Sequence, residues 1–423
     1  MKEYPLFKVH VSKEAALSEI GKVLDSSHIN EGVQVTQLTT ELSKLLESDK
    51  LCLLNSCTSA ITIALKLSGV TPGDVVISTA MTCVATNTPI VTMGAEIEWA
   101  DIDPWTGTID PVSVERAILS AKHRGKKVRA VIAVDWAGNL CDYKALREVC
   151  DKHGTKLIRD GAHALMAKYE GVQAHSIPDY STYSLQAIKH ITTGDGGILI
   201  CKNESDFKRA KALKWFGIDR DKAKDDVGNW KGQHWDFDIE EAGYKFNMNN
   251  VSAAIGLSQL PWVSKVIEKH RANADSYRKY LRQITSSELW SLSLADKSES
   301  SHWVYTVRLH YPNVEMRNKI LQKLNEQKIM AGVVHVPNHE YTCFQSSWKE
   351  LHGVDEFSSS QFSLPCGWWL NDEDVKHIVK TLMTIECELR KENLSNGVPL
   401  HTTRGDQIEK SILDEFEREI ERL

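Results

Sequence analysis

The sequence predicts an α/β protein with a mostly parallel central sheet and a smaller C-terminal α+β domain. Two observations favour this fold class. Short apolar runs, typical of buried strands, alternate with helix-length segments over the first part of the chain. From about residue 262 the pattern changes to long polar helices around a strand-like run at 303–309. Strands that alternate with helices are joined by crossovers, and crossovers connect parallel strands.

The individual elements follow in order along the chain. One helix is expected where Val35, Leu38 and Leu42 share a face, and a second around 60–65. Buried strands are expected at 75–77, 128–134, 156–158 and 197–200, with a helix at 143–153. Ligands of such sheets bind at the carboxyl ends of the strands. Asp160 follows one strand and Lys189 precedes another, so we expect both to face one cleft.

The 423 residues are enough for two domains with separate cores. We expect a large α/β domain over residues 1–261, which includes an N-terminal segment, and a small α+β domain over 262–392. Residues 393–423 form a C-terminal extension. Its apolar residues recur at helical spacing and predict an amphipathic helix that docks on its own protein or on a partner: Ile408, Ile412, Leu413, Phe416, Ile420 and Leu423.

Composition excludes several classes of function. A net charge of −6 and a pI of about 6.3 give no broad electrostatic reason to bind nucleic acid. The chain starts without an apolar signal-like region and has no run long enough to span a membrane, so we expect a cytoplasmic protein. Nine cysteines without a C-x-x-C pair predict reduced thiols and no metal site.

The stretch from Ser184 to Gly197 contains the most informative residue, Lys189. A lysine between an apolar segment and a glycine-rich turn can lose proton affinity by desolvation and attack a carbonyl as a free amine. Pyridoxal phosphate (PLP) is the commonest such carbonyl. One lysine among 51 lysines and arginines is weak evidence, so the assignment depends on the residues at fixed distances from it.

Two further motifs fit a phosphorylated pyridine aldehyde. The run 55–60 opens a helix, where amides and hydroxyls can hold a phosphate that Ser184 also contacts; the alternative is an ordinary N-cap made by Thr58 or Ser59. Asp160 can keep a pyridine nitrogen protonated while His163 bonds the phenolic oxygen of the ring. The alternative is that Asp160 caps a turn and His163 is a satisfied core histidine.

Together these motifs resemble the DegT/DnrJ family of sugar aminotransferases, within the fold type I PLP-dependent superfamily. The resemblance covers roughly residues 10 to 390. It implies a PLP-dependent aminotransferase that forms a homodimer, with each active site built from both subunits. The motifs that carry it are 55–60, 160–163, Ser184 with 189–197, and 243–248 followed by 253–256.

The resemblance also implies a role for each matching residue. Lys189 would form the internal aldimine with PLP and then shuttle protons, Asp160 would pair with the pyridinium nitrogen, and His163 would lie at the phenolic edge. The phosphate would be held by Thr58, Ser59, Ser184 and, from the partner subunit, Lys245. Relatives commonly have asparagine at the position of Lys245, and a lysine there still offers a positive charge to the anion.

Other positions depart from the family pattern or face the substrate. Cys57 stands where many relatives have glycine, and Cys83 stands where they place an aromatic residue against the cofactor ring. A thiol covers a ring less extensively than an aromatic side chain. His335 and Asn338 lie where the family carries a loop near the sugar, and we expect them to contact substrate hydroxyls. The alternative is that His302, His335 and His339, three of 16 histidines, only face solvent.

The predicted function is transfer of an amino group from an amino acid, by resemblance L-glutamate, to a keto-sugar linked to a nucleotide. The reaction would be ping-pong, through pyridoxamine phosphate, at one shared site. One alternative is a PLP-dependent sugar dehydratase, although those relatives commonly replace the lysine with histidine. A second is a cyclitol aminotransferase. A third, from another class, is a non-catalytic PLP-binding regulatory or scaffold protein whose tail helix engages a partner.

Overall fold

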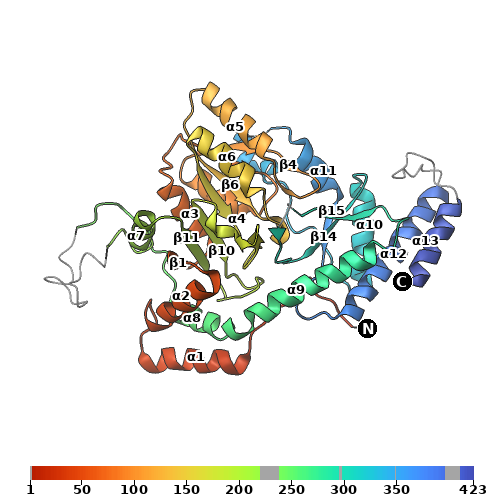
Figure 1. Cartoon of the computed structure of the whole chain (residues 1–423), viewed down its shortest axis with the longest axis horizontal. Helices are drawn as coiled ribbons and strands as arrows, with labels where there is room; N and C mark the ends of the chain where they lie inside the picture. Colours follow the sequence, from red (N-terminus) through yellow and green to blue (C-terminus); the bar gives the residue numbers. More distant parts are fainter. Residues whose placement is uncertain (1, 220–237, 295–297, 348, 396–409) are drawn as a thin grey trace.

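The computed structural model describes residues 2–219, 238–294, 298–347, 349–395 and 410–423 (Figure 1). Its centre is a seven-stranded sheet in the order β1-β11-β10-β7-β6-β2-β3. Four neighbouring pairs, from β10 through β7, β6 and β2 to β3, are parallel, whereas β11 is antiparallel to β1 and β10. The predicted mostly parallel sheet is therefore confirmed. Its strands are Leu51–Leu54 (β1), Val75–Thr79 (β2), Glu96–Ala100 (β3), Val128–Val134 (β6), Lys156–Asp160 (β7), Tyr180–Ser184 (β10) and Gly197–Cys201 (β11).

Helices cover both faces of this sheet, and three apolar clusters pack against it, one of them between α2, α8 and strands β1, β10 and β11. Another joins α3 and α4 to the sheet, and the third joins α5 and α6 to the opposite face. α6 covers the predicted 143–153, where Asp142 caps its start and Gly154 ends it in the left-handed region. The helices of this part are Lys13–Ser26 (α1), Val33–Leu46 (α2), Cys57–Leu67 (α3), Val84–Thr92 (α4), Pro111–His123 (α5), Tyr143–His153 (α6), Glu204–Leu213 (α7) and Asn250–Leu257 (α8).

A second, three-stranded antiparallel sheet follows in the order β12-β14-β15. Its core is separate from those of the large sheet and includes helices α9, α10 and α12. The long helix α9 runs from beside α8 to this smaller sheet (Figure 1). The predicted domain boundary at 261/262 falls in the first turn of this helix. The division into two domains stays a prediction. The elements are Leu260–Leu281 (α9), Leu289–Ser291 (β12), Tyr305–Leu309 (β14), Val314–Glu326 (α10), His352–Ser360 (α11), Gln361–Leu364 (β15) and Asp372–Ser395 (α12).

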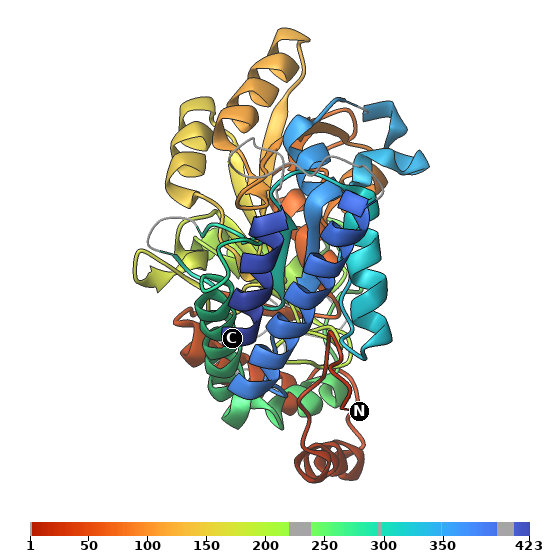
Figure 2. The same ribbon diagram turned by 90° about the vertical axis from the view of Figure 1, so that its right-hand side faces the viewer.

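The described end of the C-terminal extension is a helix that packs on its own protein. α13, Lys410–Arg422, lies side by side with α12 (Figures 1 and 2). Phe416 is fully buried under the guanidinium of Arg390, 5.4 Å from its ring centre. The Glu419 carboxylate accepts hydrogen bonds from the Thr285 hydroxyl at 2.6 Å and from the Ser286 amide at 3.1 Å. The sequence predicts that this helix docks either on its own protein or on a partner, and the structure shows it docked on its own protein.

The remaining strands are short and connect the larger elements. They are Ile102–Asp103 (β4), Thr108–Ile109 (β5), Lys168–Tyr169 (β8), Val172–Gln173 (β9) and Ser298–Glu299 (β13). All nine cysteines are free thiols. Within the described ranges, none of the helices has the length and apolarity that crossing a membrane requires. The cytoplasmic location stays a prediction.

Candidate active site

Most of the predicted cofactor residues meet at the carboxyl edge of the large sheet. Asp160 ends β7 and pairs in parallel register with Thr182 of β10, so Ser184 ends the next strand just beyond it. Because β11 is antiparallel, it starts at the same edge, where Gly197 pairs with both Ser184 and the end of β1. α3 begins three residues after β1. The fold thus brings together motifs that lie more than 120 residues apart in sequence.

Lys189 lies in the turn between β10 and β11, with its amine against an aromatic wall. Its Nζ is 3.6 Å from the centre of the Trp303 indole ring. Burial lowers the pKa of Lys189 to about 8, although the Asp160 carboxylate and the thiols of Cys57 and Cys83 act in the opposite direction. A substantial fraction of free amine therefore exists near neutral pH, as a nucleophilic lysine requires.

The Asp160 carboxylate is buried and held by two hydrogen bonds. The Thr86 hydroxyl donates to Oδ2 at 2.7 Å, and the Ala162 amide donates to Oδ1 at 3.1 Å. The Thr82 hydroxyl lies 2.8 Å from that of Thr86 and extends the chain of polar contacts. Burial raises the pKa of Asp160, while these hydrogen bonds and the charge of Lys189 counteract the rise. Only an opposing positive group would fully compensate a carboxylate in this position.

His163 presents a neutral imidazole to the same site. Its ring stacks on Trp303, with 3.9 Å between ring centres, and lies nearly parallel to the ring of His335 at 5.6 Å. Burial, followed by the charge of Lys189, holds the pKa of His163 well below its usual range. Its Nδ1 is buried and has no hydrogen-bond partner among the described residues. The alternative of a satisfied core histidine is therefore wrong for this nitrogen.

The start of α3 is organised by Ser56, which is the N-cap. Its hydroxyl accepts a hydrogen bond from the Ser59 amide at 3.0 Å, so the predicted alternative of a cap by Thr58 or Ser59 is corrected. The Ser59 hydroxyl bonds the Asn55 side chain at 2.7 Å. A Cβ on Gly197 would lie 2.3 Å from the carbonyl oxygen of Ser56, so only glycine lets β11 pass this close to the helix start.

Both cysteines of the predicted cofactor set stand at helix starts. The Cys57 thiol is 3.6 Å from the Thr182 hydroxyl, and burial raises its pKa, so the group stays a neutral thiol. Cys83 precedes α4 as its N-cap residue, without a side-chain capping bond. Both side chains are partly exposed. Ser184 is also partly exposed, and its hydroxyl accepts a hydrogen bond from the Gln186 amide at 3.2 Å.

The two predicted substrate residues differ in what their side chains already bind. Asn338 is buried; its amide group donates to the Thr82 carbonyl at 2.7 Å, and its oxygen accepts from the Asn87 side chain at 2.9 Å. These bonds tie the 338–340 turn to the segment before α4. His335 instead has a buried Nε2 without a partner among the described residues, and burial lowers its pKa to about 4. Of the two, only His335 has a side-chain nitrogen to offer a ligand.

The Lys245 amine makes its contacts with neighbouring residues of its own chain. Its Nζ donates to the Asn247 side chain at 2.8 Å and lies 3.4 Å from the ring centre of Trp215. The neighbouring Phe246 carbonyl accepts the Asn55 amide at 2.8 Å, so this segment does run beside the phosphate motif. Contact of Lys245 with a partner subunit's phosphate stays a prediction.

Sequence reasoning did not identify two residues that shape the site. Trp303 was expected only as the first residue of a strand, yet its indole contacts Lys189 and His163, and its Nε1 donates to the Ile188 carbonyl at 2.8 Å. No local pattern marks it, because these partners lie more than 100 residues away. Thr86 is only weakly indicated by the sequence. At helical spacing, Thr86 shares a face with Thr82, which neighbours Cys83, the residue expected to face the cofactor ring.

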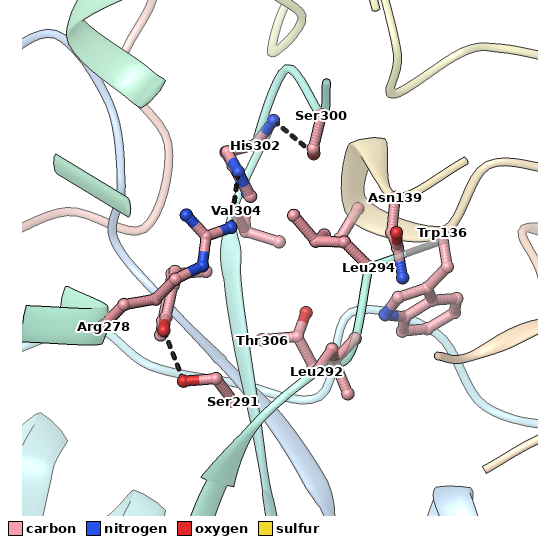
Figure 3. A pocket seen from close by; sticks show the side chains of 12 residues that line it. Trp136, Asn139, Arg278, Ser291, Leu292, Leu294, Ser300, His302, Val304 and Thr306 are labelled. Carbon is pink, nitrogen blue, oxygen red and sulfur yellow. Dashed lines mark hydrogen bonds between the residues drawn. The ribbon is translucent and has the colours of Figure 1, made fainter. Parts of the chain in front are cut away.

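A pocket with both polar and apolar lining lies on the other side of the segment that carries Trp303. His302 and Val304 line this pocket (Figure 3). Trp303, between them in the sequence, instead contacts Lys189. Across the pocket stand Trp136 and Asn139, and the Arg278 guanidinium bonds His302 Nε2 at 2.9 Å. The segment 302–304 therefore separates this pocket from the lysine.

The fold and the site define the class of this protein. A mostly parallel sheet that holds, at its carboxyl edge, a lysine of lowered pKa and a buried carboxylate fits an enzyme whose lysine amine reacts with a carbonyl. The profile of the DegT/DnrJ/EryC1/StrS aminotransferase family matches residues 11–383, and the chain belongs to that family. The resemblance seen in the motifs is confirmed.

Two curated proteins illustrate the relationship over nearly full length. The chain is 28% identical over 375 residues to the spore coat polysaccharide biosynthesis protein SpsC of Bacillus subtilis, which covers 87% of this chain and 94% of SpsC. It is 27% identical over 380 residues to UDP-4-amino-4,6-dideoxy-N-acetyl-beta-L-altrosamine transaminase of Campylobacter jejuni, which covers 89% and 96% of the two chains.

Solved structures share the fold. AtS13 from Actinomadura melliaura superimposes with a TM-score of 0.81 at 33% identity, over 90% of this chain and 98% of its own. Spr1654 from Streptococcus pneumoniae in its PLP form superimposes with a TM-score of 0.81 at 27% identity, over 92% and 100%. These neighbours support the α/β aminotransferase fold over about nine-tenths of the chain.

Proposed function

We propose that this chain uses PLP to transfer an amino group from L-glutamate to a keto-sugar linked to a nucleotide. The observation that carries the proposal is the Lys189 amine, whose pKa is lowered to about 8 next to the buried Asp160. A relative that is 27% identical is a transaminase of a UDP-linked amino sugar, which supports the acceptor class. The PLP form of a structural neighbour supports the cofactor.

The residues around Lys189 fit the reactive part of PLP. When bound, the cofactor supplies a carbonyl carbon for the amine and a ring that withdraws electrons from the substrate carbon. Asp160 is a buried carboxylate that has no cationic partner at hydrogen-bond distance in the described part of the chain, and a protonated ring nitrogen would provide that partner. The buried Nδ1 of His163 is available for the phenolic oxygen. Lys189 would then carry the proton between the donor or acceptor carbon and the cofactor.

The start of α3 fits the phosphate end. Thr58 and Ser59 stand in the first turn of that helix, where the dipole and free amides favour an anion, and Ser184 ends the neighbouring strand. The close passage of Gly197 leaves no side chain over the helix start. In a homodimer, Lys245 of the partner subunit would add a positive charge. Cys57 and Cys83 would border the ring, Cys83 in place of an aromatic side chain.

The acceptor would approach from the side of His335. Its unpartnered Nε2 can accept a hydrogen bond from a sugar hydroxyl, because the lowered pKa keeps the imidazole neutral. Asn338 would contact a hydroxyl only by exchanging one of its present bonds to Thr82 and Asn87. Both amino donor and acceptor would use one site in turn, so ping-pong kinetics are expected.

Titration with PLP, followed by L-glutamate, tests the proposal through visible absorbance. The unmodified protein should gain a yellow band that bleaches with glutamate as 2-oxoglutarate appears, whereas Lys189→Ala should fold and show neither change. Lys208→Ala, at an exposed helix position, is the matched control and should behave like the unmodified protein. Bleaching without amination of any nucleotide-linked keto-sugar would favour a cyclitol acceptor or a dehydratase. A protein that never gains the band would support the scaffold alternative.

A further inference from the structure

A buried ion pair lies directly behind the candidate cofactor site. Arg159 Nε is 2.6 Å from Asp135 Oδ2, and both side chains are 0% exposed. Arg159 immediately precedes Asp160, and successive residues of a strand point to opposite faces. The guanidinium is therefore on the far side of the sheet from the Asp160 carboxylate.

Asp135 is fixed on its own side of the pair. Its Oδ1 accepts hydrogen bonds from the Tyr143 hydroxyl at 2.6 Å and from the Cys141 amide at 3.2 Å. Its backbone amide donates to the Asp160 carbonyl at 3.1 Å. Asp135 is thereby attached both to the end of β6 and to the start of α6, on the face of the sheet away from the Asp160 carboxylate.

Arg159 uses its remaining N–H groups on the two segments that carry site residues. Nη2 donates to the Ala164 carbonyl at 3.1 Å, which closes the 160–164 turn that presents Asp160 and His163. Nη1 donates to the Tyr183 hydroxyl at 2.7 Å, one residue before Ser184. One guanidinium thus connects the ends of three neighbouring strands, and its planar fork suits three acceptors at fixed angles.

The glycine in this turn is a consequence of the same contact. A Cβ on Gly161 would lie 2.8 Å from Nη1 of Arg159. The guanidinium therefore packs directly under the backbone that follows Asp160, and a side chain at residue 161 would push the two apart. A change at Arg159 would be transmitted to this turn before any other part of the site.

We propose that Arg159 is a positioning residue, which, anchored on Asp135, holds the 160–164 turn so that Asp160 and His163 face the cofactor ring. The inference rests on the proposed use of PLP. A buried ion pair is often replaceable by apolar residues without loss of stability. The specific contribution of Arg159 lies in the bonds to Ala164 and Tyr183, which no apolar side chain can make.

Two variants separate positioning from stability. Arg159→Met removes the guanidinium but leaves Asp135 buried without its partner, so both stability and PLP affinity should fall. The double variant Asp135→Asn with Arg159→Met removes both buried charges and keeps a side-chain oxygen for the Tyr143 hydroxyl and the Cys141 amide, so it should recover most of the stability. It should not recover PLP affinity, because the bonds to Ala164 and Tyr183 are still missing. We expect its Kd for PLP to stay weakened by about tenfold or more, as for a small misplacement of a binding group.

The measurements are denaturant unfolding of the apoprotein, PLP titration by absorbance, and hydrogen exchange of the amides of residues 161–164. Arg159→Lys keeps the charge but can reach fewer acceptors. Its stability, PLP affinity and hydrogen exchange at 161–164 should lie between those of the unmodified protein and of Arg159→Met. Arg308→Met is the matched control, because Arg308 is equally buried in β14 and bonds Pro104 and Glu356, neither of which belongs to the candidate site. It should lose stability while its PLP affinity and the exchange at 161–164 stay unchanged.

The proposal is overturned if the double variant recovers both stability and PLP affinity, since Arg159 would then serve stability alone. It is also overturned if exchange at 161–164 is unaffected in Arg159→Met. These outcomes are distinct from failure of the proposed function, in which the unmodified protein itself would not bind PLP. In that case the faster exchange at 161–164 in the Arg159 variants would still be expected in the apoprotein.

Discussion

The amine nitrogen of Lys189 lies 3.6 Å from the centre of the Trp303 indole ring, and the same ring stacks on His163 at 3.9 Å. Trp303 is itself fixed, because its Nε1 donates to the Ile188 carbonyl and its backbone amide donates to the Ala137 carbonyl at 2.9 Å. A residue from the segment that leads into β14 of the small sheet therefore forms one wall around the lysine of the large sheet.

The reactivity of Lys189 should depend on pH with a midpoint of about 8. Because burial lowers its pKa from 10.5, the free amine increases as pH rises to 8, where an ordinary lysine is still protonated. An amine-reactive reagent labels only the free amine of Lys189. Its labelling rate in the apoprotein, measured by mass spectrometry from pH 6 to 10, therefore reports this midpoint. Labelling of Lys208 in the same samples is the control. A midpoint near that of Lys208 would contradict the prediction.

Trp303→Leu should shift that midpoint downward, since the ammonium form loses its contact with the ring face. A cation–π contact of about 1 kcal/mol corresponds to a shift of about 0.7 in pKa. Trp303→Phe keeps a ring and should show a smaller shift, although it also loses the bond to Ile188. The same labelling experiment measures both variants, after circular dichroism has shown that each is folded. An upward shift in Trp303→Leu would mean that water entry, and not the ring contact, controls the lysine.

Asp160→Asn should bind PLP but lose amino transfer by about 100-fold or more, because a neutral amide cannot keep the ring nitrogen protonated. Thr86→Val removes one hydrogen bond to this carboxylate and should have a smaller effect, because Asp160 keeps its charge and the hydrogen bond from the Ala162 amide. Thr88→Val, exposed on the same helix, is the matched control. Single-turnover absorbance changes with L-glutamate give the rates. Equal rates in Asp160→Asn and the unmodified protein would exclude the assigned role.

His335→Ala and Asn338→Ala should affect different properties. His335→Ala should raise the KM for the keto-sugar with little change in stability, since its Nε2 has no protein partner among the described residues. Asn338→Ala should lower the free energy of unfolding by about 1–3 kcal/mol, because it leaves buried groups of Thr82 and Asn87 unpaired. Steady-state kinetics and denaturant unfolding on both variants test this contrast. A reversed pattern would assign the sugar contact to Asn338.

Phe416→Ala should cost about 3 kcal/mol of stability, as truncation of a buried aromatic side chain does, because Phe416 is fully buried between α13 and α12. Glu415→Ala, exposed on the neighbouring position, should change stability by less than about 0.5 kcal/mol. Denaturant unfolding measures both. PLP affinity should be unchanged in both, since α13 contributes no residue to the candidate site. Unchanged stability in Phe416→Ala would mean that α13 does not dock in solution.

Sequence reasoning succeeded where the relevant pattern is local. The strand that ends at Asp160, the glycine turn after Lys189 and the helix that begins near Cys57 are each readable from apolar runs and their boundaries. Because the carboxyl ends of neighbouring parallel strands share one edge, the meeting of Asp160, Ser184 and Lys189 could also be expected. Sequence reasoning failed for the N-cap of α3, because Ser56, and not Thr58 or Ser59, has the extended backbone that an N-cap requires.

The sequence by itself determined the fold class, the family and the candidate lysine, because hydrophobic periodicity and short motifs are properties of neighbouring residues. Only the tertiary structure decided that Trp303 contacts Lys189, that the Asn338 amide is already bonded to Thr82 and Asn87, and that Arg159 supports the turn after Asp160. Each of these depends on side-chain directions across different elements. Packing of the whole chain sets such directions, and no local periodicity encodes them.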